Sequence, residues 1–205
     1  MPPSTLIPLN TNLKLLNMKN KGIICIETEF EITTTGNKLP LNSEPLLQFL
    51  SKVHNIPYIY RRVATIEELK YYFQKFRRKE YLNKYHFFYF SFHGETQLIS
   101  LESGTTINLE ELSEIADGIF EGKFVHFGSC RTMLGSQTKI EDFCRNTGAK
   151  MVSGFTKKVD CALCAIHDMA FIAETINCKQ VPSIISHMDK LYGGLQDKLG
   201  FRYAL

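Results

Sequence analysis

The sequence lacks long hydrophobic segments, a large excess of either charge and internal repeats. Its apolar runs fall well short of the ~20 residues that a transmembrane helix needs, so we expect no membrane association. The 24 Lys and Arg residues against 21 Asp and Glu residues give a net charge of +3, too balanced to indicate a nucleic-acid partner. Residues 1–17 contain no basic start followed by a continuous apolar run, so we expect no secretory signal.

The composition is that of an average globular domain. Apolar residues make up 44% and charged residues 22% of the 205 residues. A chain of this length buries roughly 70% of its unfolded surface, which suffices for a core without disulfides. The six cysteines are scattered through apolar segments, as in proteins of a reducing compartment. We therefore expect a cytoplasmic protein with a loose N-terminal arm over residues 1–17 and a single domain over residues 18–205.

Strand and helix patterns alternate along this domain. Thr65 with Glu68 forms a capping-box pattern at the start of one helix, and Ser43, Asn108 and Asp160 are expected to cap others. The alternation implies right-handed crossovers, hence an α/β fold: a three-layer sandwich with a mainly parallel sheet and helices on both faces. The expected strands are 22–26, 57–64, 86–92, 123–127 and 150–156, with a hairpin at 97–109; the expected helices are 44–55, 65–85, 109–119, 136–147, 160–176 and 181–199.

A histidine and a cysteine follow two of these strands. The third strand runs into SFHGE, with His93, and the fourth into GSCRT, with Cys130. If the two strands are neighbours, ~4.8 Å apart, both side chains emerge at the sheet edge where α/β proteins bind ligands. An imidazole promotes formation of the nucleophilic thiolate. The N–H groups of Gly94 and Cys130 are candidate donors to an oxyanion.

The two motifs resemble those of the caspase-like cysteine peptidases, the clan of caspases, metacaspases, separases and CHAT-type proteases. SFHGE is similar to the caspase Ser-His-Gly-Glu segment, with Phe92 inserted before the histidine. GSCRT is similar to the Gln-Ala-Cys-Arg-Gly segment of caspases and the Asp-Ser-Cys segment of metacaspases. The element order agrees over about residues 20–175, and the size suits a small bacterial-type member.

The resemblance implies a caspase-like fold and a cysteine endopeptidase that acts on a polypeptide substrate through an acyl-enzyme. Cys130 would be the nucleophile, His93 the general base or acid, and Gly94 an oxyanion donor. No metal or cofactor is implied. An effector role in a defence or cell-death pathway follows by analogy with the family. No long linker follows Cys130, so we expect control by a partner, a small-molecule signal or oligomerisation rather than by linker cleavage.

Substrate specificity is less strongly indicated. Two positions before the nucleophile, caspases carry Gln and metacaspases carry Asp, but this chain has Gly128. The nearest acidic groups follow the first strand, which favours Arg or Lys before the scissile bond. The candidate substrate-binding residues are Glu27, Glu29, Ser129 and Asp160, with Glu31 beside them. Asp160 is also explained as a helix cap, and Ser129 as a small residue before a tight turn.

Two other functions remain open. GSC could be the nucleophile elbow of a hydrolase or amidotransferase-like enzyme, but that motif needs glycine at position 132, where Thr132 stands, and a later histidine, His167 or His187. A catalytically silent caspase-like binding or sensor module is the second alternative.

The helical Cys161-x-x-Cys164-x-x-His167 pattern raises the question of a metal site. Its apolar surroundings favour buried core residues without a metal, because a lone CxxC motif is a weak signal.

Overall fold

The computed structural model describes residues 21–29 and 42–205. The expected N-terminal arm and Glu31 lie outside the described residues, and a single domain over residues 18–205 stays a prediction. Five strands run parallel, and the last pairs antiparallel with β8 at the sheet edge. The sheet has the order β2-β1-β3-β7-β8-β9, formed by β1 (Gly22–Glu27), β2 (Tyr58–Arg62), β3 (Tyr85–Ser91), β7 (Phe124–Phe127), β8 (Met151–Phe155) and β9 (Phe201–Ala204).

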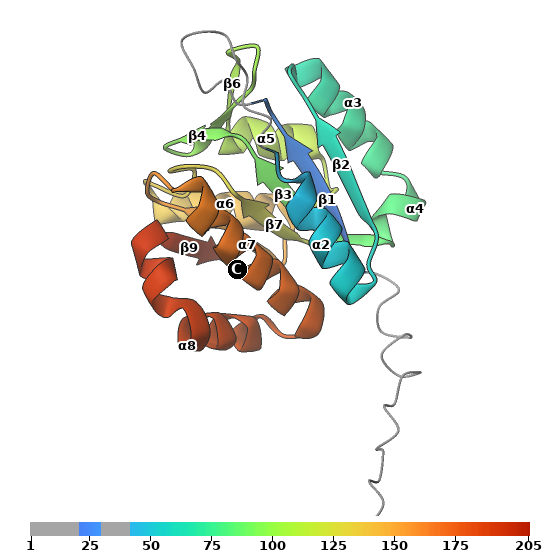
Figure 1. Ribbon diagram of the computed structural model, residues 1–205. Helices are drawn as coiled ribbons and strands as arrows, with labels where there is room; N and C mark the ends of the chain where they lie inside the picture. The colour runs from blue at the N-terminus through green and yellow to red at the C-terminus, as the bar shows by residue number, and fades with distance from the viewer. Residues whose placement is uncertain (1–20, 30–41) are drawn as a thin grey trace, which may run out of the picture.

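Helices cover both faces of this sheet, so the expected three-layer α/β sandwich is confirmed. One apolar core joins the sheet to α3, α5 and α6, and a second joins the opposite face to α2, α7 and α8. In Figure 1, α2 and α7 lie in front of the sheet and α5 and α6 lie behind it. The helices are α2 (Glu44–His54), α3 (Ile66–Phe76), α4 (Lys79–Leu82), α5 (Leu109–Ala116), α6 (Gln137–Thr147), α7 (Cys161–Asn177) and α8 (Val181–Leu199).

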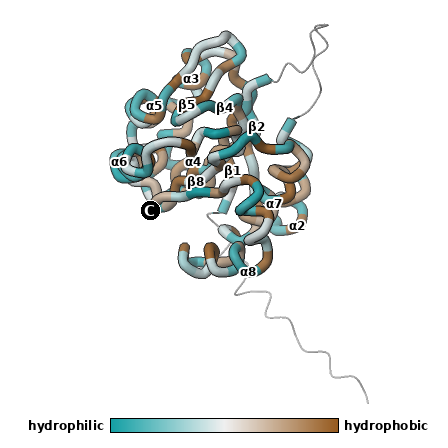
Figure 2. The backbone as a smooth tube through the Cα atoms, turned by 90° about the vertical axis from the view of Figure 1, so that its left-hand side faces the viewer, coloured by the Kyte–Doolittle hydropathy of each residue, from teal (hydrophilic) through white to brown (hydrophobic). Residues whose placement is uncertain are grey.

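The burial patterns follow from the residue types. Strands β1 and β7 are buried at every position, as expected of parallel strands covered on both faces. The outer helices alternate between hydrophobic and hydrophilic stretches, so each can bury one side against the sheet (Figure 2). The capping box of Thr65 and Glu68 is present at the start of α3, and Asp160 caps α7 through the N–H groups of Ala162 and Leu163.

Several expected elements differ in detail. The helix expected over 65–85 is broken into α3 and α4, because Arg78 adopts an extended conformation between them. Ser43 precedes α2, but its hydroxyl bonds to the Ser91 hydroxyl at 3.0 Å instead of capping the helix. The expected hairpin is part of a three-stranded sheet of β4 (His93–Glu95), β5 (Leu98–Ser100) and β6 (Thr106–Asn108). Strand β9 was not expected at all.

No helix in the described part of the chain combines the length and the apolar composition required to cross a bilayer.

Candidate active site

The strands that precede His93 and Cys130 are neighbours. Strands β3 and β7 pair in parallel, with Phe90 opposite Phe127. Parallel neighbours end at the same sheet edge, so the segments that follow them emerge side by side. This arrangement is the one that the sequence predicted for the two motifs.

The two segments are also tied together beyond the strands. The backbone N–H of Phe92 donates to the hydroxyl of Ser129 at 3.2 Å. The guanidinium of Arg131 pairs with the carboxylate of Glu95 at 3.1 Å. A β-carbon on Gly94 would lie 2.2 Å from the carbonyl oxygen of Cys130. Only glycine allows this approach, so the motif glycine has a direct packing reason.

His93 and Cys130 line the same cavity, which has a volume of about 630 Å³. All six histidines lie in the described part of the chain, and of these only His93 lines the cavity. Three cysteines, Cys130, Cys161 and Cys164, line it. The cavity therefore brings one candidate base and one motif cysteine to a shared space within the size range of ligand pockets.

Two backbone features surround Cys130. Its sulfur accepts a hydrogen bond from the N–H of Val159 at 3.4 Å, an interaction that is stronger for a thiolate than for a thiol. Arg131, the next residue, has φ = 58°, in the left-handed region of the backbone that residues other than Gly rarely adopt. Such conformations cluster at functional sites, where surrounding contacts hold them. Here the N–H of Arg131 donates to the carbonyl of Lys157 at 3.1 Å.

The protonation state of His93 suits a base. Partial burial lowers the pKa of its imidazole below the ordinary value of 6.5, because desolvation disfavours the charged form. The ring is therefore mostly neutral at pH 7 and has a nitrogen lone pair with which to accept a proton.

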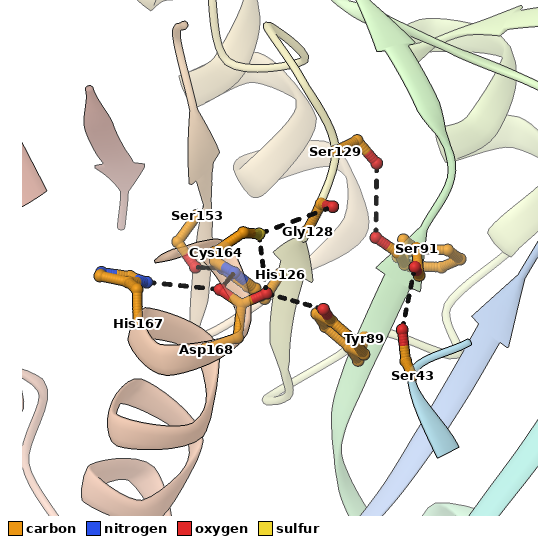
Figure 3. A network of polar contacts seen from close by, with 11 residues as sticks. Ser43, Tyr89, Ser91, His126, Gly128, Ser129, Ser153, Cys164, His167 and Asp168 are labelled. Carbon is orange, nitrogen blue, oxygen red and sulfur yellow. Dashed lines mark hydrogen bonds and ion pairs between the residues drawn. The ribbon is translucent and has the colours of Figure 1, made fainter. Parts of the chain in front are cut away.

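A buried carboxylate, Asp168 of α7, lies at the centre of a polar network next to the cavity-lining residues Tyr89 and Cys164 (Figure 3). It accepts hydrogen bonds from the Tyr89 hydroxyl at 2.7 Å and the Cys164 thiol at 3.4 Å, and both donors line the cavity. Its other oxygen lies 2.9 Å from Nε2 of His126 and 3.3 Å from Nδ1 of His167. These hydrogen bonds hold two of the side chains that line the cavity.

The electrostatics keep Asp168 ionised. Burial alone would raise its pKa, but the charge and hydrogen bonds of His126 and His167 outweigh burial and hold the pKa below its ordinary value. Burial and the nearby carboxylate raise the pKa values of Tyr89 and Cys164, so both stay protonated and donate to it. No sequence pattern indicates this cluster; the single local signal is His126, a polar residue inside an otherwise apolar strand.

Comparison with known proteins assigns the chain to a family. A family model described as a family of unknown function, DUF6642, matches residues 20–204. The chain belongs to this family. No curated protein matches its sequence. Among solved structures, the fold is similar to that of the Drosophila initiator caspase Dronc, with a TM-score of 0.59 and 10% identity over 91% of this chain and 80% of that chain. This DUF6642 protein therefore has a caspase-like fold.

The candidate substrate-binding residues occupy different positions. Glu27, at the end of β1, lines the cavity although it is buried; it accepts from the Ser43 N–H at 2.8 Å and the Tyr60 hydroxyl at 2.6 Å. Glu29 lies 3.6 Å from Arg62 and is not among the residues that line the cavity. Their roles stay predictions.

The remaining candidates also differ in position. Ser129 is buried and holds the N–H of Phe92, and Asp160 caps α7 beside the cavity residue Val159. At Gly128, a β-carbon would lie 2.6 Å from the Tyr89 hydroxyl. The Tyr89 side chain thus occupies the space that a larger side chain at position 128 would need.

The structure separates the members of the CxxCxxH pattern. Cys164 and His167 are buried as expected, but Cys161 is exposed and lines the cavity. The expectation of burial is wrong for Cys161 because it is the first residue of α7, at the helix end that faces the cavity. The two histidines that a nucleophile elbow would require, His167 and His187, are not among the residues that line the cavity with Cys130.

Proposed function

We propose that this protein is a cysteine endopeptidase that cleaves a polypeptide through an acyl-enzyme on Cys130. The observation that carries the proposal is the shared cavity at the ends of β3 and β7, lined by Cys130 and, of the six histidines, by His93 alone. The caspase-like fold supports the same reaction class by analogy.

The proposed reaction has two stages. Neutral His93 accepts the thiol proton, and the Cys130 sulfur attacks the substrate carbonyl carbon. The N–H groups of Gly94 and Cys130 hold the developing oxyanion. When the tetrahedral intermediate collapses, the peptide C–N bond breaks and His93 returns the proton to the leaving amine. A water molecule, deprotonated by His93, then attacks the thioester carbonyl. The C–S bond breaks, the acid product leaves, and His93 returns the proton to the Cys130 sulfur.

The contacts around Cys130 favour this sequence of steps. The Val159 N–H stabilises negative charge on the sulfur before attack. The Arg131–Glu95 ion pair and the Gly94 packing contact link the segment that carries the nucleophile to the segment that carries the base. Contacts between the two segments help to hold the reacting groups in place, and correct placement contributes strongly to catalysis.

A peptide library with every residue type before the scissile bond tests the activity directly. We expect cleavage by the native chain, its loss in Cys130→Ser, and a decrease of about 10²- to 10⁴-fold in His93→Ala. Cys161→Ser is the matched control, because it removes a second thiol of the same cavity that lies outside the GSCRT motif. Activity that survives in Cys130→Ser would refute the peptidase proposal. If the library is not cleaved and an electrophilic peptide probe does not label Cys130 selectively, the result would favour a silent binding module.

We further propose a preference for Arg or Lys before the scissile bond, with Glu27 as the charged partner. A carboxylate has about four acceptor positions, and two contacts at Glu27 are made to Ser43 and Tyr60, which leaves acceptor capacity toward the cavity. An uncharged substrate residue would leave this buried charge without compensation. The same library measures the preference: we expect Glu27→Gln to reduce cleavage after Arg and Lys more than cleavage after other residues. Cleavage after Asp alone would contradict it, and would point to Lys158, which also lines the cavity.

Control by a partner, a ligand or oligomerisation completes the proposal. The segment between Cys130 and Lys150 is largely occupied by α6, which packs into the core through Ile140 and Phe143. Cutting this segment would disrupt the core rather than release a linker. Intact-mass measurement of the active protein should show an uncut chain; an absolute requirement for a cut between Cys130 and Lys157 would refute this mode of control.

A further inference from the structure

A second cluster of polar side chains lies where α7 meets α8. Glu174 and Cys178 are one helical turn apart at the end of α7, and His187 comes from α8. The thiol of Cys178 lies 3.3 Å from Oε2 of Glu174 and 3.6 Å from Nδ1 of His187, and these last two atoms are 2.9 Å apart. Three potential ligand atoms thus converge on one point at a partly exposed surface.

The arrangement does not fit a catalytic triad. In such a triad the base uses one ring nitrogen for the nucleophile and the other for the acid that orients it. Here the sulfur and the carboxylate oxygen both face Nδ1 of His187. Because the sulfur and the carboxylate oxygen approach the same ring nitrogen, all three atoms could instead bind one metal ion placed between them.

The distances are close to those of a tetrahedral zinc site. Bonds of about 2.3 Å to sulfur and about 2.0–2.2 Å to nitrogen and oxygen separate tetrahedral ligand atoms by roughly 3.3–3.6 Å. The three observed separations, 3.3, 3.6 and 2.9 Å, come within about 0.4 Å of that range. Sulfur, imidazole nitrogen and carboxylate oxygen are also the three donor types that zinc accepts.

We propose that Glu174, Cys178 and His187 form a zinc-binding site that clamps the end of α7 to α8, with a water molecule as fourth ligand. On binding, the Cys178 thiol loses its proton to solvent and the Cys178 sulfur becomes a thiolate ligand. The hydrogen bond between His187 and Glu174 is replaced by two metal–ligand bonds, and the His187 ring proton resides on Nε2 so that Nδ1 is free to bind the ion. Partial exposure of all three residues gives the ion a path from solvent.

The neighbouring charges set the strength of the site. Lys21, which interacts electrostatically with Cys178, donates a hydrogen bond to the Ile176 carbonyl at the end of α7. The positive charge of Lys21 weakens the binding of a cation at this site. The negative charge of the Cys178 thiolate offsets that effect. Replacing Lys21 with Met should therefore tighten zinc binding.

The buried cluster of His126, His167 and Asp168 is a weaker candidate for the same ion. Its members are closed off from solvent, and Asp168 already accepts from Tyr89 and Cys164 as well as facing both histidines. Zinc there would have to displace this hydrogen-bond network.

Titration of the metal-free full chain with zinc chloride and with cobalt chloride tests the proposal. We expect one zinc ion per chain by elemental analysis and calorimetry, a near-ultraviolet sulfur-to-cobalt charge-transfer band, and a rise in Tm of about 5–10 °C at a zinc concentration 100 times Kd. Cys178→Ser should abolish the charge-transfer band and weaken zinc binding at least tenfold, and Glu174→Gln should weaken it in the same direction.

Two controls separate this site from its alternatives. Asp189→Asn, an exposed change two positions after His187, should leave zinc binding unaltered. Cys161→Ser tests the CxxCxxH pattern and should also leave it unaltered. Stoichiometric binding that persists in Cys178→Ser, or the absence of stoichiometric binding by the native chain, would overturn the proposal. Helix α7 has 17 residues and spans about 25 Å between the cavity and this cluster, so Cys178→Ser should leave peptide cleavage unchanged, and the two proposals fail independently.

Discussion

The α-carbon of Gly94 lies so close to the Cys130 carbonyl that an added β-carbon would come within 2.2 Å of that oxygen. The same β-carbon would lie 2.3 Å from the Thr132 hydroxyl. Both neighbours belong to the segment that carries the proposed nucleophile, so a methyl group at position 94 must push that segment away from β4.

Gly94→Ala should therefore lower both stability and activity. Overpacking of this kind costs about 1–3 kcal/mol, measurable by urea unfolding, and the displacement of Cys130 should reduce peptide cleavage at least tenfold. Gly193→Ala is the matched control, because a β-carbon there meets nothing within 4 Å and the residue lies within helix α8. That change should raise stability by roughly 0.5–1 kcal/mol. A fully active Gly94→Ala protein would show that the close contact has no functional role.

The pH dependence of cleavage should report on His93. Burial lowers the pKa of this imidazole below 6.5, so its neutral form persists below that pH. As the pH falls through the lowered pKa, the ring becomes protonated, can no longer accept the thiol proton, and kcat/KM should decrease. We expect the midpoint of this acid limb below pH 6.5, and its loss in the residual activity of His93→Ala. A limb centred above pH 6.5 would contradict a neutral histidine base.

Removing the buried carboxylate at position 168 should be strongly destabilising. Asp168→Asn leaves His126 and His167 without their ionised partner, and breaking a buried pair typically costs about 3–5 kcal/mol. Urea unfolding measures this loss. Asp142→Asn, which breaks the exposed pair with Arg145, should cost less than about 1 kcal/mol. Equal costs for the two variants would show that the buried network contributes no more than a surface pair.

Acid should destabilise the fold partly through His86. Burial lowers the pKa of this ring to about 4, and its Nε2 has no hydrogen-bond partner among the described residues. The unfolded chain binds a proton at this histidine below pH ~6.5, whereas the folded chain does so only near pH 4, so stability falls as the pH decreases between these values. The expected loss is on the order of 3 kcal/mol. His86→Phe should reduce that pH dependence; identical pH dependence in the variant and the native chain would rule out this origin.

The alternation of strands and helices was enough to predict the layers of the fold, because hydrophobic periodicity is a local property. The break between α3 and α4 was not predictable, since Arg77 and Arg78 give no helix-stopping signal. Arg77 is held at the break by an ion pair with Asp117, 40 residues later, which no local pattern shows. Strand β9 has four residues after Gly200, and its pairing with β8 depends on tertiary contact.

The candidate site was predictable where it follows strand ends and unpredictable where it depends on side-chain partners. The positions of His93 and Cys130 follow from the order of β3 and β7 in the sheet. By contrast, the sequence does not predict that the carboxylate of Glu27 accepts hydrogen bonds from Ser43 and Tyr60. Nor does it predict that the Tyr89 side chain packs against Gly128. Such contacts join segments that are distant in sequence, so no local hydrophobic pattern indicates them.

The parallel pairing of β3 with β7 has a consequence for folding as well as for chemistry. Each strand brings only one of the two motif residues. In a chain whose β3 and β7 have not yet paired, none of the six thiols lies next to His93, so none is expected to be more reactive than the others. Selective reactivity of Cys130 should appear only when the pair forms. The time course of its labelling during refolding is thus a reporter of one particular long-range strand pairing, readable without any spectroscopic probe.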